Sequence, residues 1–139
     1  MTAFAAIVSA VIASLEAAPA MCDKIYRARP EEVPEQVDRA VNVQWDTAVP
    51  SRGAINEAPI DWTTRMSVEC FAKGVGDSGD LLVDPLLAAA YGRIAELVID
   101  GVDFELIGLE AENSANGKKT GWVRMTYNVQ HRTNNLSLN

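Results

Sequence analysis

Near the start of the chain, apolar residues recur at steps of three and four, which is the spacing of one side of an α-helix. This stripe consists of Phe4, Ile7, Val8, Val11, Ile12 and Leu15. Alanines fill much of the remaining surface, so a second element could pack closely against the back of the helix. No Lys or Arg precedes Lys24, and Glu16 interrupts the apolar run. The pattern therefore favours a helix ending at Pro19 over a secretory signal or a membrane span.

Three longer segments alternate between apolar and polar residues, which is typical of a strand with one buried face. They cover residues 37–46, 61–73 and 120–132. In the last segment the alternation directs four apolar residues inward, namely Val123, Met125, Tyr127 and Val129. Its outward positions are Trp122, Arg124, Thr126, Asn128 and Gln130. Two further strands are expected at residues 24–28 and 102–112, and the latter should place Phe104, Leu106 and Gly108 on one face.

Turn-forming residues mark a second helix and a hairpin. Asp84 is expected to cap the helix, with Pro85 at its first position, where the missing N–H costs nothing. The helix should end near Gly101, because glycine readily adopts the left-handed conformation that follows a helix. Residues 113–119 contain Asn116-Gly117 and are expected to form a hairpin turn or a longer loop.

The order of these elements predicts the α+β class, with a mostly antiparallel sheet of four to five strands and two main helices packed against it. A length of 139 residues suits a single domain that spans residues 1–139. Hydrophobic residues make up 48% of the chain and charged residues 22%, as expected for a globular core with a solvated surface. The net charge of −7 argues against nucleic-acid binding through the phosphate backbone.

One motif points to nucleotide chemistry. Gly74-Val75-Gly76-Asp77-Ser78-Gly79 fits the Gly-x-Gly-x-x-Gly pattern of dinucleotide-binding loops. In those loops the glycines open the helix that receives the pyrophosphate, whereas here the helix is expected to begin five residues after Gly79. The preceding strand also alternates, unlike a central strand of a parallel sheet. The motif is therefore interpreted as a strand-to-helix loop, and a small nucleotide-binding domain is the weaker alternative.

Other candidate chemistry is sparse. His131 is the single histidine and is expected at the surface or a sheet edge. Asp100, Asp103 and Glu105 lack calcium-loop spacing and are interpreted as a solvated turn. Cys22 and Cys70 lie in no zinc-binding pattern, which favours a reduced, cytosolic chain, although the sequence leaves open whether they form a disulfide. We therefore predict no catalytic, cofactor-binding or metal-binding residues, and a chain that is not an enzyme.

The candidate contact residues fall into two groups. A basic group joins Lys118 and Lys119 of the hairpin to Arg124 on the last strand, where it could meet a partner's acidic surface. If Trp122 points outward beside Arg124, it is a candidate interface anchor, because Trp and Arg dominate binding hot spots. The second group is the small-residue back of the first helix, which includes Ala6, Ala10 and Ala13.

The layout resembles that of the tail terminator proteins of long-tailed bacteriophages, the lambda minor tail protein U type. A small N-terminal helix and a strand near residues 41–46 come first. The amphipathic strand Trp62-Thr63-Thr64-Arg65-Met66-Ser67-Val68-Glu69-Cys70-Phe71-Ala72 follows, then the helix Asp84-Pro85-Leu86-Leu87-Ala88-Ala89-Ala90-Tyr91 and two final strands. Residues 29–34 align with nothing in that layout.

This resemblance implies a structural protein that forms a hexameric ring, caps the tail tube, stops its polymerisation and offers a surface to the head. It implies three partners, which are other copies of the chain, the tail tube protein and a head-completion or connector protein. It places the protein in the virion tail, assembled in the cytoplasm of a bacterial host, without a cofactor or a membrane. Another head-tail connector or tail-completion protein is the alternative of the same class.

Overall fold

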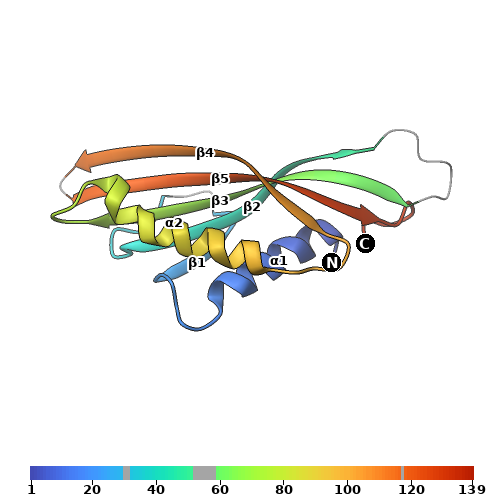
Figure 1. Cartoon of the computed structure of the whole chain (residues 1–139), viewed down its shortest axis with the longest axis horizontal. Helices are drawn as coiled ribbons and strands as arrows, with labels where there is room; N and C mark the ends of the chain where they lie inside the picture. The colour runs from blue at the N-terminus through green and yellow to red at the C-terminus, as the bar shows by residue number, and fades with distance from the viewer. Residues whose placement is uncertain (30–31, 52–58, 117) are drawn as a thin grey trace.

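The computed structural model describes residues 1–29, 32–51, 59–116 and 118–139. These residues form α1 (Ala3–Glu16), β1 (Lys24–Arg27), β2 (Arg39–Pro50), β3 (Ile60–Gly74), α2 (Gly79–Glu96), β4 (Asp103–Asn116) and β5 (Lys118–Thr133). The strands make one sheet in the order β1-β2-β3-β5-β4. Every pair is antiparallel except β1 with β2. Both helices lie against the same face of the sheet (Figure 1). The predicted α+β fold is therefore confirmed.

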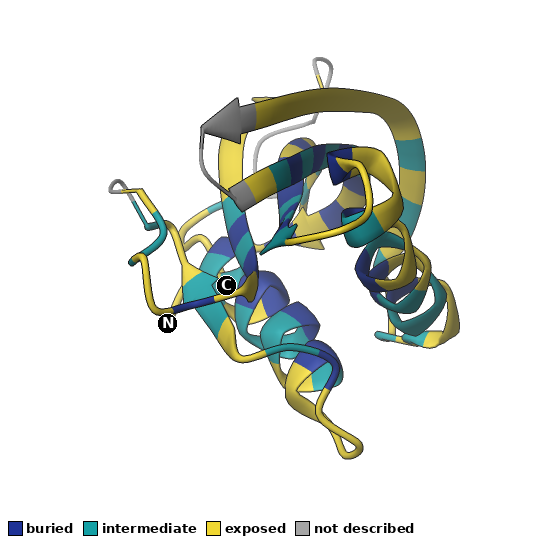
Figure 2. Ribbon diagram, turned by 90° about the vertical axis from the view of Figure 1, so that its left-hand side faces the viewer, coloured by how far each residue is buried: buried dark blue, intermediate teal, exposed yellow. Residues whose placement is uncertain are grey.

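The core fills the space between this helix-covered face and the two helices (Figure 2). The inward positions expected for the last strand, Val123 to Val129 in steps of two, are all buried. From β3 the core receives Met66, Val68, Cys70 and Ala72. The stripe predicted for α1 is buried except for Ile12, which is partly buried against the core. Neither described helix combines the length and the apolar character needed to cross a membrane.

Arg93 of α2 joins the two helices. Its guanidinium donates to the carbonyl oxygens of Leu15 at 2.8 Å and Ala17 at 2.7 Å, and also to that of Pro19. In return the Ser14 hydroxyl donates to the Arg93 carbonyl at 3.3 Å. The last carbonyls of a helix have no partner within the helix, so a cation at this position both satisfies them and interacts favourably with the helix dipole.

The expected start of the second helix is wrong. The helix begins at Gly79 with Ser78 in the N-cap position, and Pro85 lies inside it. Asp84 is therefore an exposed residue of the second turn rather than the cap. The Ser78 hydroxyl does not cap the backbone but donates to the carboxylate of Asp80 in the first turn.

The last hairpin also differs from expectation. β4 and β5 pair as far as Asn116 with Lys118, so most of residues 113–119 belongs to strands, and residue 117 lies outside the described residues. A bulge between Leu106 and Gly108 shifts the register of β4. Gly108 therefore pairs with the outward residue Thr126, and the prediction that it shares a face with Phe104 and Leu106 is wrong.

Candidate functional site

We call the face of the sheet opposite the helices the open face (Figure 2). Two rows of side chains cross it from one edge to the other, as the strand register requires. The first row is Tyr26, Asn42, Glu69, Arg124 and Glu110, and the second is Lys24, Ala40, Phe71, Trp122 and Glu112.

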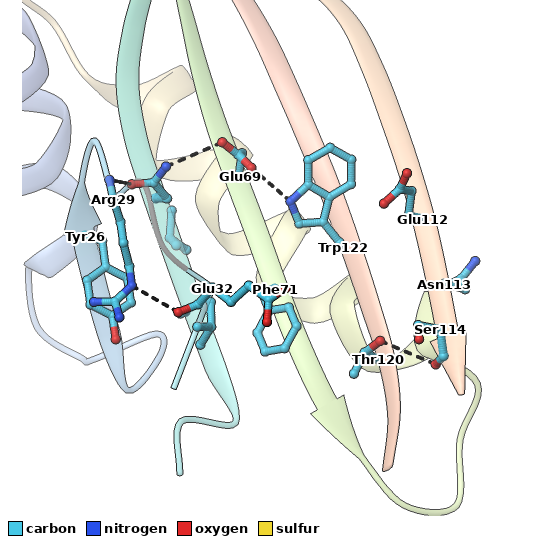
Figure 3. Close-up of a pocket in the computed structure, with 14 residues that line it drawn as sticks. Tyr26, Arg29, Glu32, Glu69, Phe71, Glu112, Asn113, Ser114, Thr120 and Trp122 are labelled. Atoms are coloured by element: carbon cyan, nitrogen blue, oxygen red, sulfur yellow. Dashed lines mark hydrogen bonds between the residues drawn. The ribbon is translucent and has the colours of Figure 1, made fainter. Parts of the chain in front are cut away.

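Glu69 of β3 is the centre of a polar network on this face (Figure 3). One carboxylate oxygen accepts from the Asn42 amide at 3.4 Å, and the other accepts from the Trp122 indole N–H at 3.0 Å. The guanidinium of Arg124 lies 3.8 Å from Glu69 and 3.9 Å from Glu110, and it also stacks over the Trp122 ring at 5.1 Å. Because partners from four strands constrain one another, the site is largely preorganised.

A groove of about 650 Å³ lies beside this network. Its floor comes from β2, β3 and β5, and one bank comes from Glu112, Asn113 and Ser114 of β4. The other bank is formed by Tyr26 with Arg29, Glu32 and Val33 (Figure 3). The guanidinium of Arg29 stacks over the Tyr26 ring at 4.5 Å, and the Arg29 backbone N–H donates to Asn42 at 2.9 Å. A groove of this volume can accommodate several side chains of a partner.

The predicted contact residues occupy two opposite sides of the sheet. Trp122 and Arg124 point onto the open face, as the alternation of the last strand predicted, and both are half-buried. On the helical side Ala6 and Ala13 are exposed on α1, whereas Ala10 is half-buried. Lys119 is exposed near the tip of the β4–β5 hairpin. Lys118 begins β5, but its side chain lies outside the description.

No protein-family model matches this chain, and no curated protein matches it. Function is therefore inferred from the geometry of the described residues.

Two residues of β3 that line the open face carry no role in the sequence-based prediction. The alternation of residues 61–73 puts Glu69 at an outward position, and Phe71 is the one apolar residue among those positions. In the structure Phe71 is simply an outward residue that pairs with Trp122 across β3 and β5. Strict alternation would have put Glu69 and Phe71 on the outward face. The sequence could not show that β5 lies next to β3, because the neighbour of a strand depends on the tertiary arrangement.

The structure opposes a phosphate site at residues 74–79. Gly79 does open a helix, contrary to the sequence prediction, but its Cα packs directly on β5. A Cβ at Gly79 would lie 2.7 Å from the carbonyl carbon of Thr120 and 2.8 Å from the side-chain oxygen of Asn113. The Asp80 carboxylate also places a negative charge in the first turn of the helix, where a phosphate would have to bind. The preceding strand β3 is antiparallel to both of its neighbours, so no βαβ unit is present there.

His131 lies in the core rather than at the surface, so that expectation is wrong. Its side chain is only 5% exposed, and its Nε2 is 2.7 Å from the Thr64 hydroxyl. The ring of Phe4 meets it edge to face at 5.0 Å. Burial lowers the pKa of the His131 imidazole, because the charged form is poorly solvated there. These contacts indicate a structural role beneath α1.

Cysteine thiols and acidic side chains are the remaining candidate groups in the described part of the chain. Cys22 and Cys70 are both free thiols. Burial, with a smaller contribution from Cys22, raises the pKa of the Cys70 thiol to about 12, so this thiol stays protonated and unreactive at neutral pH. Within the described residues, no three His, Cys, Asp or Glu side chains gather as metal ligands would.

Proposed function

We propose that this protein is a ring-forming structural component of a bacteriophage or prophage tail, a terminator that caps the tail tube, stops its polymerisation and offers a surface to the head. The observation that carries the proposal is the position of the two contact surfaces. The open face with Trp122 and Arg124 lies on one side of the sheet, and the alanine-lined back of α1 lies on the other. One protomer can therefore use both surfaces at the same time.

Two different surfaces on one protomer are what a closed ring needs. A ring is built from heterologous contacts, in which one patch of each copy meets a different patch of the next copy. A two-fold dimer instead pairs one patch of a copy with the same patch of its partner. The small side chains of α1 allow a neighbouring surface to approach its backbone closely.

The charge of the protein suits the same role. A net charge of −7 keeps phosphate-rich DNA from adhering to the protein as it passes through a tail. The proposed partners are further copies of the chain, the tail tube protein and a head-completion or connector protein. The layout of helix, strands, helix and strands supports the tail-terminator assignment through its resemblance to that family.

The mass of the protein in solution tests the proposal. Native mass spectrometry and sedimentation velocity should show a hexameric species that becomes more populated as concentration rises towards the millimolar range. Electron microscopy of the same sample should show rings with a central opening. A two-fold dimer as the largest assembly, or a monomer even at the highest concentration, would contradict ring formation.

A further inference from the structure

The outer edge of β4 is a long sheet edge without a partner strand among the described residues (Figure 1). β4 runs over 14 residues and pairs with β5 on its other side. No backbone hydrogen bond from another described segment reaches residues 103–116. In such a strand every second residue directs its N–H and C=O groups away from the sheet, so this edge can accept a further strand.

The side chains that β4 presents on the open face beside this edge are acidic. Asp103 and Glu105 are exposed there, and their partners across β5 are the uncharged residues Gln130 and Asn128. The surrounding stretch, residues 94–116, contains six acids and no Lys or Arg. A strand that approaches this edge therefore meets negative charge first.

The cations of the open face lie further from this edge. Arg65 is on β3, and Arg132 of β5 is held by Asp61 in an ion pair of 2.7 Å. Arg124 is four positions along β5 from the partner of Glu105, which corresponds to about 13 Å. A strand added outside β4 would lie about 5 Å from β4 and about 14 Å from β3. It would therefore be closer to the acids than to these cations, and apart from the contact proposed for the ring.

The helical side of the same edge is apolar and incompletely covered. A hollow of about 270 Å³ lies between α2 and β4, and its lining includes Tyr91 and Ala95 of α2 and Phe104 and Leu106 of β4. Leu109 pairs with an inward residue of β5 and so is on the helical side, yet its side chain is 60% exposed. A strand added to β4 would place every second side chain on this apolar side.

We propose that the outer edge of β4 binds an extended segment of a partner protein in which Lys or Arg alternates with apolar residues. The backbone of the segment would extend the sheet, its apolar side chains would enter the hollow and cover Leu109, and its cations would meet Asp103 and Glu105. In this mode of binding, main-chain hydrogen bonds supply affinity and the alternate side chains supply specificity. Charge complementarity selects a basic segment, because an acidic one would be repelled.

The described strands of the chain itself fit this edge poorly. A second copy of β4 would oppose acids to acids, because β4 contains no Lys or Arg. β1 is only four residues long, and its helical-side residue Arg27 is already bonded to the Ser9 hydroxyl and the Ala5 carbonyl of α1. Residues 44–50 of β2, which extend beyond β1, carry Asp46 and no cation. The occupant is therefore a different protein, and its binding does not require the ring.

An NMR titration of the full chain with a synthetic peptide tests the site. The probe is acetyl-Lys-Val-Lys-Val-Lys-Val-amide, whose lysines and valines lie on opposite faces when the peptide is extended. The control, acetyl-Lys-Lys-Lys-Val-Val-Val-amide, has the same composition and charge without the alternation. The alternating peptide should shift the β4 amide resonances in a saturable way and slow hydrogen exchange at every second β4 amide. The control should bind about tenfold more weakly.

Neutral variants separate an edge effect from a general charge effect. Asp103→Asn and Glu105→Gln should each weaken binding of the alternating peptide roughly two- to fivefold, which is the range for exposed ion pairs. Asp46→Asn removes the same charge from β2, three strands from β4, and should leave the affinity unchanged. All three residues are exposed, so the variants should fold like the parent protein.

A pair of alanine variants tests the apolar side. Ala95→Leu would fill the hollow and should weaken binding about tenfold, which is the equivalent of one buried valine side chain. Ala88→Leu makes the same change at an exposed position of α2 outside the hollow and should not alter binding.

The failing results are distinct. The inference is overturned if millimolar alternating peptide neither shifts nor protects the β4 amides, or if the control peptide binds and protects them equally well. It is also overturned if Asp46→Asn weakens binding as much as Asp103→Asn, or if Ala88→Leu weakens it as much as Ala95→Leu. Protection of the same β4 amides by raising the protein concentration alone would show that the occupant is a second copy. Peptide binding by a protein that stays monomeric would refute the ring and leave the edge site intact.

Discussion

Replacing Gly121 by alanine would place a methyl group where β5 meets the first turn of α2. Built on the present backbone, the added Cβ would lie 2.5 Å from the carbonyl carbon of Gly79 and 3.2 Å from its Cα. Ordinary carbon–carbon contacts are about 3.5 to 4.0 Å, so the helix and the strand would have to separate by about 1 Å. The obstacle is backbone on both sides, and no flexible side chain can rotate away.

We expect Gly121→Ala to lower the free energy of unfolding by about 3 kcal/mol or more, the upper part of the range for overpacked sites. Gly92→Ala is the matched control, because an added Cβ at this position in α2 meets nothing within 4 Å. In a helix interior that change should raise stability by about 0.5 to 1 kcal/mol.

The assay is urea unfolding followed by circular dichroism, with thermal melts as a second measure. For a chain of this size, 1 kcal/mol corresponds to a melting shift of roughly 3 to 5 °C, so the two variants should differ by more than 10 °C. Equal stabilities for Gly121→Ala and Gly92→Ala would refute the close approach of α2 to β5. If Gly121→Ala lowers the free energy of unfolding without changing its slope against urea concentration, the effect lies in the folded state.

Three further variants test other parts of the structure. Arg93→Ala should lower the free energy of unfolding by about 1 to 3 kcal/mol, because the last carbonyls of α1 lose their donor, and calorimetry would measure the loss. Arg93→Lys should restore only part of this stability. An unchanged stability of Arg93→Ala would show that this contact does not hold the helices together. The pKa of His131 is lower in the folded protein than in the unfolded chain. Its contribution to stability is therefore fully present above about pH 6.5 and is lost as the pH falls through the folded pKa. Unfolding by urea at a series of pH values should show His131→Gln losing less stability than the parent protein on acidification, whereas parallel curves would contradict the burial of the ring. The double variant Trp122→Ala, Arg124→Ala should still fold, with a free energy of unfolding lower by about 1 to 2 kcal/mol, and should no longer form the ring when its mass is measured. Arg65→Ala on the same face should leave both the stability and the ring unchanged.

Local patterns in the sequence determined the elements and most of their buried faces. The three- and four-residue spacing identified α1, and the period of two assigned the inward and outward residues of β5 from Trp122 to Gln130 correctly. These predictions succeeded because the hydrophobic effect favours burial of the apolar face of each helix and strand. The outward position of Trp122 and Arg124 followed from the same rule.

The local rules failed where packing between distant segments decided the outcome. Asp84 and Pro85 carry a strong signal for a helix start, yet α2 begins at Gly79, where contact between its backbone and β5 fixes the first turn. The bulge before Gly108 reversed the face of that residue. His131 lies two positions after Val129 on the inward side of β5, where Phe4 of α1 covers it.

The candidate site depended most on the tertiary structure. Asn42, Glu69, Trp122 and Glu112 lie far apart in the sequence, and only the strand order β2-β3-β5-β4 makes them neighbours. A residue's own sequence neighbourhood fixes which way its side chain points, because that direction depends on local backbone geometry. The sequence neighbourhood does not fix which strand lies beside the residue, because the order of strands in the sheet depends on the free energy of the whole chain.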